Sequence, residues 1–341
     1  MSPRSPLDAL ADALGSRARR REPLGPLTTY GVGGAAALFV HVEQPADLEA
    51  VRAICRSLPL PEDAFSVFVL GRGSNVLVAD RGFDGLVLHL GSGFADVVLP
   101  GRSGTESAQP DRSGTEQAIV RAGGAVALPV LARRVADAGW SGLSWAVGVP
   151  GSLGGAVRMN AGGHGSDMAA RVRRYRWVDL LRDEGATDEV AQLHYGYRQS
   201  SVGASVVVVE AELAVHAGSV EAERQTLRDI VTWRRAHQPG GANAGSVFAN
   251  PDGDSAGRLI ELAGLKGLRM GSAQVSDKHA NFIQADKGGR ADDVYVLMGQ
   301  VRAEVERRSG VCLRTEIRLL GFDVGETGPM AQVDVGHGEG G

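Results

Sequence analysis

The sequence is poor in cysteine, in net positive charge and in long apolar runs, and each shortage excludes a class of protein. The two cysteines, Cys55 and Cys312, stand in apolar sequence, which favours buried free thiols over a disulfide framework or a metal site. A formal charge of −4 gives no basic field for nucleic acid. No stretch approaches the ~20 apolar residues of a membrane span, and residues 1–23 lack the apolar core of a signal peptide. We therefore expect a cytoplasmic protein without a nucleic-acid partner, membrane insertion or a metal ion.

Glycine, by contrast, is in excess. The chain has 48 glycines among 341 residues, well above the usual share of ~7%. They gather at residues 31–34, 71–73, 148–165 and 240–245. Because glycine has no Cβ, such clusters mark places where the backbone turns tightly or approaches a ligand closely.

Hydrophobic periodicity predicts a mixture of strands and helices, and at ~150 residues per domain the length favours two domains. Short apolar runs predict strands at residues 37–42, 66–70, 85–90, 118–122, 175–180, 205–215 and 312–320. Apolar residues at helical spacing predict helices at residues 46–58, 128–138, 219–236 and 291–309. The pentapeptide RSGTE begins at Arg102 and again at Arg112, which we interpret as a duplicated surface loop.

The first candidate site is a glycine-rich turn after the predicted strand 66–70. Successive backbone N–H groups in such a turn can form a concave site for an anion. The turn matches neither G-x-G-x-x-G nor a Walker A motif, and an ordinary glycine-serine turn is the alternative. The candidate cofactor-binding residues here are Gly71, Arg72, Gly73, Ser74, Asn75 and Val76.

The second candidate site is the glycine-rich segment at residues 147–165. Its apolar flanks predict a buried loop, and buried backbone donors need a partner, which a diphosphate provides. Two such sites suit a dinucleotide pyrophosphate, whereas a tight structural turn is the alternative. The candidate cofactor-binding residues here are Gly148, Pro150, Gly151, Ser152, Gly155, Ala156, Asn160, Gly162, His164 and Gly165.

Six motifs in order resemble the UDP-N-acetylenolpyruvoylglucosamine reductase (MurB) family, and the similarity runs from Leu27 to Phe322. They are GRGSNVLVADRGFDG, GVPGSLGGAVRMNAGGHG, GYRQS, NAGSVFANP, SDKHANFI and LRTEIRLLGF. The resemblance implies an α+β fold, with a vanillyl-alcohol-oxidase-like FAD-binding region of two α+β subdomains and a C-terminal α+β substrate domain. On this basis we expect an N-terminal tail at residues 1–21, the FAD-binding region at 22–215, the substrate domain at 216–322 and a disordered tail at 323–341.

The same resemblance implies an activity in peptidoglycan synthesis. NADPH reduces a non-covalent FAD, which then reduces the UDP-sugar UDP-N-acetylglucosamine enolpyruvate to UDP-N-acetylmuramate, and the enzyme is expected to be a monomer. Hydride addition at C3 of the enolpyruvyl group leaves an enolate, which Arg198 and Glu316 stabilise. Ser246 then donates a proton to C2 as a general acid. Without the resemblance, these three residues have ordinary interpretations as a loop arginine, a strand carboxylate and a turn serine.

Three further residues are expected to contact the substrate: Tyr197, His237 and Asn250. Tyr197 can equally fill the core. The sequence also departs from the family pattern, since His164 replaces a frequent tyrosine and His237 stands where a lysine often precedes the serine motif. The interval from Arg198 to Ser246 leaves no room for the tyrosine-bearing insertion of the longer subtype, so the chain resembles the shorter one.

Two other functions remain open at this stage. The first is an FAD-dependent oxidase on the same fold, which would pass electrons to oxygen. The second is a flavin- or nucleotide-binding regulatory protein without turnover, although binding alone does not require Arg198, Ser246 and Glu316 together.

Overall fold

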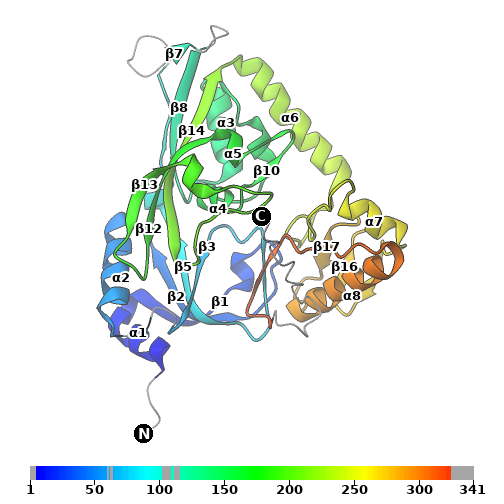
Figure 1. Ribbon diagram of the computed structural model, residues 1–341, viewed down its shortest axis with the longest axis horizontal. Helices are drawn as coiled ribbons and strands as arrows, with labels where there is room; N and C mark the ends of the chain where they lie inside the picture. Colours follow the sequence, from blue (N-terminus) through cyan, green and yellow to red (C-terminus); the bar gives the residue numbers. More distant parts are fainter. Residues whose placement is uncertain (1–4, 60, 62–63, 102–108, 111–115, 324–341) are drawn as a thin grey trace, which may run out of the picture. The chain divides into compact units, whose positions relative to one another are not determined.

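The computed structural model describes residues 5–59, 61, 64–101, 109–110 and 116–323 (Figure 1). The chain forms two compact units. The first comprises residues 1–22, 36–73 and 84–236, and the second comprises residues 23–35, 74–83 and 237–341. These bounds differ from the expected division at residue 216, because each unit is built from segments that are far apart in the sequence.

A sheet with the strand order β1-β2-β5-β3 begins the first unit (Figure 1). Its β3 and β5 are parallel, and α1 and α2 contribute Leu10 and Val51 to the same buried cluster as Leu38 and Leu86. The strands are β1 (Ala18–Pro23), β2 (Ala35–Val42), β3 (Ser66–Leu70) and β5 (Phe83–Leu90), and the helices are α1 (Pro6–Leu14) and α2 (Pro45–Ser57). The predicted order of strand 37–42, helix 46–58 and strand 66–70 is confirmed.

The expectation of an N-terminal tail over residues 1–21 is wrong for its described part. Ser5 caps α1 by accepting a hydrogen bond from the backbone N–H of Asp8, and Leu10 and Leu14 are buried. The basic cluster that follows lies in β1, where Arg19, Arg20 and Arg21 are all exposed. A short amphipathic helix gains its stability from packing rather than from its own propensity, which is why the sequence alone gave a weak signal.

A second sheet in this unit has the strand order β13-β12-β14-β8-β6, with β7 paired to β8 and β9 paired to β14. Its neighbouring strands are antiparallel, and its core includes Val120, Trp140 and Leu213. Most of both RSGTE copies, residues 102–106 and 112–115, lies outside the described residues. The elements are β6 (Val97–Val98), β7 (Gln109–Pro110), β8 (Glu116–Gly123), α3 (Leu128–Asp137), β9 (Trp140–Ser141), α4 (Leu153–Arg158), α5 (Met168–Arg171), β12 (Val172–Asp179), β13 (Gly185–Glu189), β14 (Val206–Ala217) and α6 (Val220–His237).

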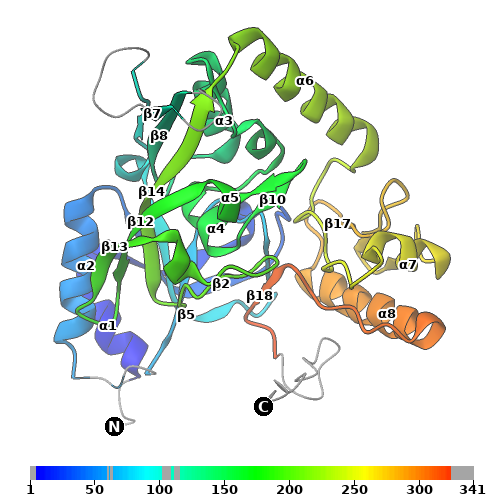
Figure 2. The ribbon, with the colours of Figure 1, turned by 45° about the horizontal axis from the view of Figure 1, so that its top comes forward.

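The second unit contains a small antiparallel sheet packed with two helices (Figure 2). The helix α8 spans the residues predicted for it, and Val294, Leu297, Val301 and Val305 on its apolar face are all buried. The elements are α7 (Ala256–Leu262), β15 (Arg269–Met270), β16 (Ala273–Val275), β17 (Ile283–Ala285) and α8 (Ala291–Ser309).

Two short parallel strands, β4 (Val76–Val78) and β18 (Arg318–Leu320), complete the second unit. The strand predicted at residues 312–320 is therefore shorter, although its alternation holds at Leu313 and Ile317, which are buried, and at Arg314, which is exposed. Both cysteines are free, with Cys55 buried and Cys312 half-buried. No helix among the described residues is long and apolar enough to cross a membrane.

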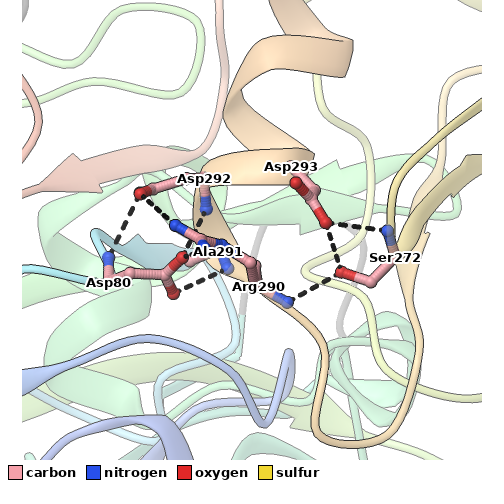
Figure 3. A network of polar contacts seen from close by, with 6 residues as sticks. All are labelled: Asp80, Ser272, Arg290, Ala291, Asp292 and Asp293. Atoms are coloured by element: carbon pink, nitrogen blue, oxygen red, sulfur yellow. Dashed lines mark hydrogen bonds and ion pairs between the residues drawn. The ribbon is translucent and has the colours of Figure 1, made fainter.

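A polar network explains why residues 74–83 belong to the second unit (Figure 3). The Asp80 carboxylate accepts hydrogen bonds from the backbone N–H groups of Ala291 (2.9 Å) and Asp292 (3.3 Å), which open α8. Arg290 Nε lies 3.2 Å from the same carboxylate, and Asp292 accepts a bond from the Asp80 N–H at 3.2 Å. Beside them, Asp293 accepts the Ser272 N–H at 2.7 Å. Asp80 thus caps the N-terminus of α8, although it lies 211 residues before Ala291 in the sequence.

We predict that Asp80→Ala lowers the free energy of unfolding by about 1–2 kcal/mol, because two N–H groups of α8 lose their acceptor. Urea unfolding followed by circular dichroism measures the change. Glu306→Ala is the matched control, since it removes an exposed acid from the same helix without touching the network. An equal loss in both variants would contradict the capping role.

Candidate functional site

The two glycine-rich segments predicted to bind a cofactor meet within the first unit. A Cβ on Gly71 would stand 2.3 Å from Ser152 Oγ, so the Ser152 hydroxyl would have to turn away. Arg72 Nε donates a hydrogen bond to the carbonyl of Pro150 at 3.3 Å. The turn after β3 therefore lies against the start of α4, in contact with the Ser152 side chain.

Backbone contacts fix the other side of α4. The N–H of Leu153 donates to the carbonyl of Val126 and the N–H of Gly154 to that of Gly124, both at 2.8 Å. A Cβ on Gly154 would lie 3.0 Å from the Val208 carbonyl oxygen, and one on Gly124 would lie 2.2 Å from it. Glycine at these positions allows α4 to pack directly on β14.

A cavity of about 300 Å³ lies among these segments in the first unit. Four of its lining residues were candidates from sequence: Gly71, Arg72, Ser152 and Gly155. The others come from the ends of β3 and β5, from residues 124–125, and from α4 and its surroundings. They are Val69, Leu70, His89, Leu90, Gly91, Ser92, Ala95, Gly124, Ala125, Gly154, Arg158, Val202, Val206 and Val208.

Sequence reasoning missed the contribution of β5 and of the turn after β8. Gly91 and Gly93 follow the predicted strand 85–90, and Gly123 and Gly124 follow the predicted strand 118–122. These glycines were the sequence signal that could have indicated the contribution of both segments. Several of the predicted cofactor residues do not line this cavity. They include Gly148, Asn160, Gly162, His164 and Gly165.

Arg198 lies against the glycine-rich segment of the first unit. Its Nη1 and Nη2 atoms donate to the carbonyls of Asn160 (3.3 Å) and Gly162 (2.8 Å). Arg198 has a left-handed backbone, with φ of 56°, and its guanidinium lies 5.0 Å from the centre of the Tyr197 ring, which is 55% exposed. The buried Asn160 ties the two segments together, since its Nδ2 donates to the Gly196 carbonyl at 3.0 Å. The structure thus joins the predicted Arg198 to the predicted loop.

His164 faces α6 within the same unit. Its ring meets the edge of Trp233 with centroids 5.2 Å apart. Burial, and then the nearby Arg234 cation, lower the pKa of His164 from its usual value. A Cβ on Gly148 would lie 3.2 Å from Arg234 and 3.3 Å from His164, so this glycine accommodates both side chains.

Ser246 and Glu316 belong to the second unit, where their backbones lie on paired segments. The N–H of Glu316 donates to the carbonyl of Val247 at 2.8 Å, next to Ser246, and the Glu316 carbonyl accepts Asn75 Nδ2 at 3.2 Å. Gly245 adopts φ of 79° and donates its N–H to Asn243 Oδ1. The glycine and asparagine around the half-buried Ser246 therefore form the turn that presents it.

Asn281 was not singled out from the sequence, although it lies in the SDKHANFI motif. It is buried, and it clamps the Ser246 segment through Phe248. Its Oδ1 accepts the Phe248 N–H at 3.0 Å and its Nδ2 donates to the Phe248 carbonyl at 2.8 Å. The backbone carbonyl of Asn281 also accepts the Val247 N–H at 2.9 Å. An asparagine between Ala280 and Phe282, within one of the motifs that resemble the family, was the available signal.

The remaining predicted residues have the following places. Asn250 is exposed, and its Oδ1 accepts the N–H of Ala256 at the start of α7 at 3.1 Å. His237 is exposed at the last position of α6. Ser74 and Asn75 belong to the second unit, and Val76 begins β4.

Comparison with known proteins decides the family. The profile of an FAD binding domain matches residues 36–187, and the profile of the C-terminal domain of UDP-N-acetylenolpyruvoylglucosamine reductase matches residues 237–320. The reductase of that name from Heliobacterium modesticaldum is 41% identical over 312 residues, which cover 90% of this chain and 92% of the relative. The chain belongs to this reductase family.

Further similarities agree with this assignment. A second reductase of the family, from Symbiobacterium thermophilum, is 39% identical over 311 residues, covering 90% of this chain and 93% of the relative. The crystal structure of the MurB reductase from Thermus caldophilus superposes with a TM-score of 0.72 and 31% identity, covering 89% of this chain and 99% of that chain. The expected α+β fold, with an FAD-binding region followed by the C-terminal domain of this family, is confirmed.

The residues of the cavity fit FAD. Its glycines allow a ligand to approach the backbone, its valines offer an apolar wall, and Arg72 and Arg158 supply positive charge for a diphosphate. A Cβ on Gly155 would meet only Ser152 Oγ within 4 Å, at 3.4 Å, so this position is open toward the cavity it lines. The cofactor is FAD, with NADPH as the reductant.

We predict that Gly155→Val gives a folded protein with little bound FAD, because the added methyl groups enter the cavity without striking the backbone. The flavin-to-protein absorbance ratio, measured with circular dichroism of the same sample, tests this. Gly163→Val is the control, since nothing lies within 4 Å of a Cβ at Gly163 and it does not line the cavity. A Gly155→Val variant that retains its full FAD content would place the cofactor elsewhere.

Proposed function

We propose that this protein reduces the enolpyruvyl group of UDP-N-acetylglucosamine enolpyruvate with electrons from NADPH, giving UDP-N-acetylmuramate for peptidoglycan synthesis. Family membership over about 90% of the chain carries this proposal. When bound, FAD accepts a hydride from NADPH and delivers it to the substrate double bond. The residues described below supply binding, charge and a proton.

The FAD-binding role is assigned to the first unit. Gly71 and Gly155 admit the dinucleotide to the backbone, and Ser152 lies between them. Arg72 and Arg158 offset the charge of its diphosphate through their guanidinium groups. We retain Gly148, Asn160, Gly162, His164 and the other predicted loop residues as candidates for contacts beyond this cavity.

We propose that three residues act on the substrate during the reaction. Arg198 and Glu316 stabilise negative charge, and Ser246 donates a proton. After hydride addition at C3, negative charge spreads from C2 into the substrate carboxylate. The Arg198 cation, oriented by two backbone carbonyls, stabilises that charge, together with a protonated or strongly hydrogen-bonded Glu316. Ser246 then donates its hydroxyl proton to C2. A serine in this role needs no neighbouring base, since it never acts as a nucleophile.

Substrate contacts, cellular location and oligomeric state complete the proposal. Tyr197 and His237 are exposed, and Asn250 accepts the N–H of Ala256 at the start of α7. The free Cys55 and Cys312 are in keeping with a reducing cytoplasm. We propose a monomer in the cytoplasm, which sedimentation velocity of the FAD-bound protein checks.

Turnover in air and without oxygen distinguishes the proposed reductase from an oxidase. The purified FAD-bound protein is mixed with NADPH and the UDP-linked enolpyruvyl sugar. We expect NADPH oxidation that depends on the sugar and proceeds without oxygen, with a product two hydrogen atoms heavier by mass spectrometry. Oxygen-dependent NADPH oxidation that ignores the sugar would favour the oxidase, and bound FAD without any turnover would favour a regulatory protein.

We predict that Ser246→Ala leaves FAD content and flavin reduction by NADPH nearly intact but slows flavin reoxidation by the sugar by about 10²–10⁴-fold. Stopped-flow absorbance separates the two half-reactions. Ser246→Cys is the matched variant, since its thiol keeps a proton donor and should restore part of the reoxidation rate. Slower reduction with normal reoxidation would refute proton donation by Ser246.

A further inference from the structure

Two histidines and a glutamate form a hydrogen-bonded chain at the wall of the cavity. His89 on β5 lines the cavity, and His41 lies on the adjacent strand β2. Their Nδ1 atoms are 3.0 Å apart, and the rings stack with centroids separated by 5.1 Å. On its other side, His41 Nε2 lies 2.9 Å from Glu43 Oε2.

The turn after β5 holds Glu43 in place. The backbone N–H of Ser92 donates to Glu43 Oε1 at 3.1 Å, and the Ser92 hydroxyl donates to the same oxygen. A Cβ on Gly91 would lie 2.1 Å from Glu43 Oε2 and 2.8 Å from His41 Nε2, so only glycine fits here. The hydrogen bonds from Ser92 and then from His41 lower the pKa of Glu43, which keeps it ionised while histidines titrate.

Hydrogen-bond chemistry determines where the protons lie in this chain. The ionised Glu43 can only accept, so His41 Nε2 carries a proton. Two nitrogens 3.0 Å apart need one donor and one acceptor. In the neutral pair His41 Nδ1 accepts, His89 Nδ1 donates, and the remaining nitrogen of His89, Nε2, is an acceptor.

One added proton reverses these roles. His41 becomes a cation that donates at both nitrogens, so His89 Nδ1 accepts and His89 Nε2 carries a proton. A second proton would place two donors against each other across the 3.0 Å contact. Burial, and then the charge of His41, lower the pKa of His89, in keeping with a pair that holds a single proton.

We propose that Glu43 and His41 are positioning residues that act through His89, so that one proton bound by the pair turns His89 Nε2 into a hydrogen-bond donor for the bound dinucleotide. This inference rests on the proposed function, because it assigns the cavity to FAD. The protonated pair presents a positive charge and an N–H donor at His89 Nε2. FAD is anionic and rich in hydrogen-bond acceptors, so it interacts favourably with both. FAD therefore binds more tightly when the pair holds its proton.

The other charged side chains on the surrounding elements are arginines and carboxylates. Arg72 and Arg158 line the cavity and add guanidinium groups there. The strand β3, which pairs with β5 on the far side from β2, carries no titratable side chain. On β1, which flanks β2, Arg19 pairs with Glu22 and Arg20 with Asp8.

The sign of the pH effect follows from linkage. FAD is rich in hydrogen-bond acceptors, so its binding raises the pKa of the His41–His89 pair. The extra affinity for FAD is therefore fully present below the pKa of the free pair. It is lost as the pH rises through the pKa of the pair in the FAD-bound protein. A shift of about one pKa unit corresponds to about a tenfold change in the dissociation constant.

The test measures the dissociation constant of FAD for the full-length protein stripped of flavin, by quenching of flavin fluorescence, from about pH 5 to about pH 8. We expect the constant to rise about tenfold across this range in the unmodified protein. His89→Asn should abolish the dependence, because asparagine keeps a polar atom near the Nδ1 position but has no second ring nitrogen. Glu43→Gln should move the whole profile to lower pH, since the cationic pair loses its carboxylate.

His194→Asn is the control, because His194 is an exposed histidine in left-handed backbone, which asparagine tolerates, and should keep the unmodified profile. Histidine ¹⁵N resonances of the flavin-free protein supply an independent readout, in which His41 and His89 should take up one proton between them. Tight FAD binding with a flat pH profile, or a pH dependence that survives in His89→Asn, would overturn this inference alone. No FAD binding at any pH would overturn the proposed function as well.

Discussion

The close approach of the turn after β3 to the start of α4, at Gly71 and Ser152, is the constraint on which the cofactor cavity depends. These two segments are separated by about 80 residues in the sequence, yet a Cβ at Gly71 would displace the Ser152 hydroxyl. Gly154 and Gly124 set a stricter limit between α4 and β14, because a Cβ at either position would meet the backbone carbonyl of Val208. The glycine excess is thus concentrated where backbone packs directly on backbone and leaves room for a dinucleotide.

In the second unit, hydrogen bonds hold the segment that carries Ser246 in a defined position. No catalytic triad is needed for this. A left-handed Gly245 starts the turn, and the buried Asn281 holds Phe248 by two hydrogen bonds. The pairing of Glu316 with Val247 then brings the backbone of the proposed charge-stabilising residue beside that of the proposed proton donor. Polar groups that are fully satisfied and buried hold such a segment rigidly.

The sequence predicted those parts of the fold whose signals are local. The helix α8 was predicted with its observed bounds because its apolar residues recur at helical spacing over 19 residues. The division into units was not predictable, since β4 joins the second unit through long-range contacts such as its pairing with β18 and the contact of Asp80 with the start of α8. Likewise, Gly71 and Ser152 were recognisable as candidates, whereas His89 was not, because its place at the cavity depends on the sheet order.

Hydrogen exchange with and without FAD tests most directly whether the cavity built on Gly71 and Ser152 is the cofactor site. The measurement follows backbone amides by mass spectrometry in the flavin-free and FAD-bound protein. The account predicts that FAD slows exchange most strongly at residues 69–72, 89–92, 124–125 and 152–158, the segments that contain most of the residues lining the cavity. Protection that spares these segments and falls elsewhere in the chain would contradict it.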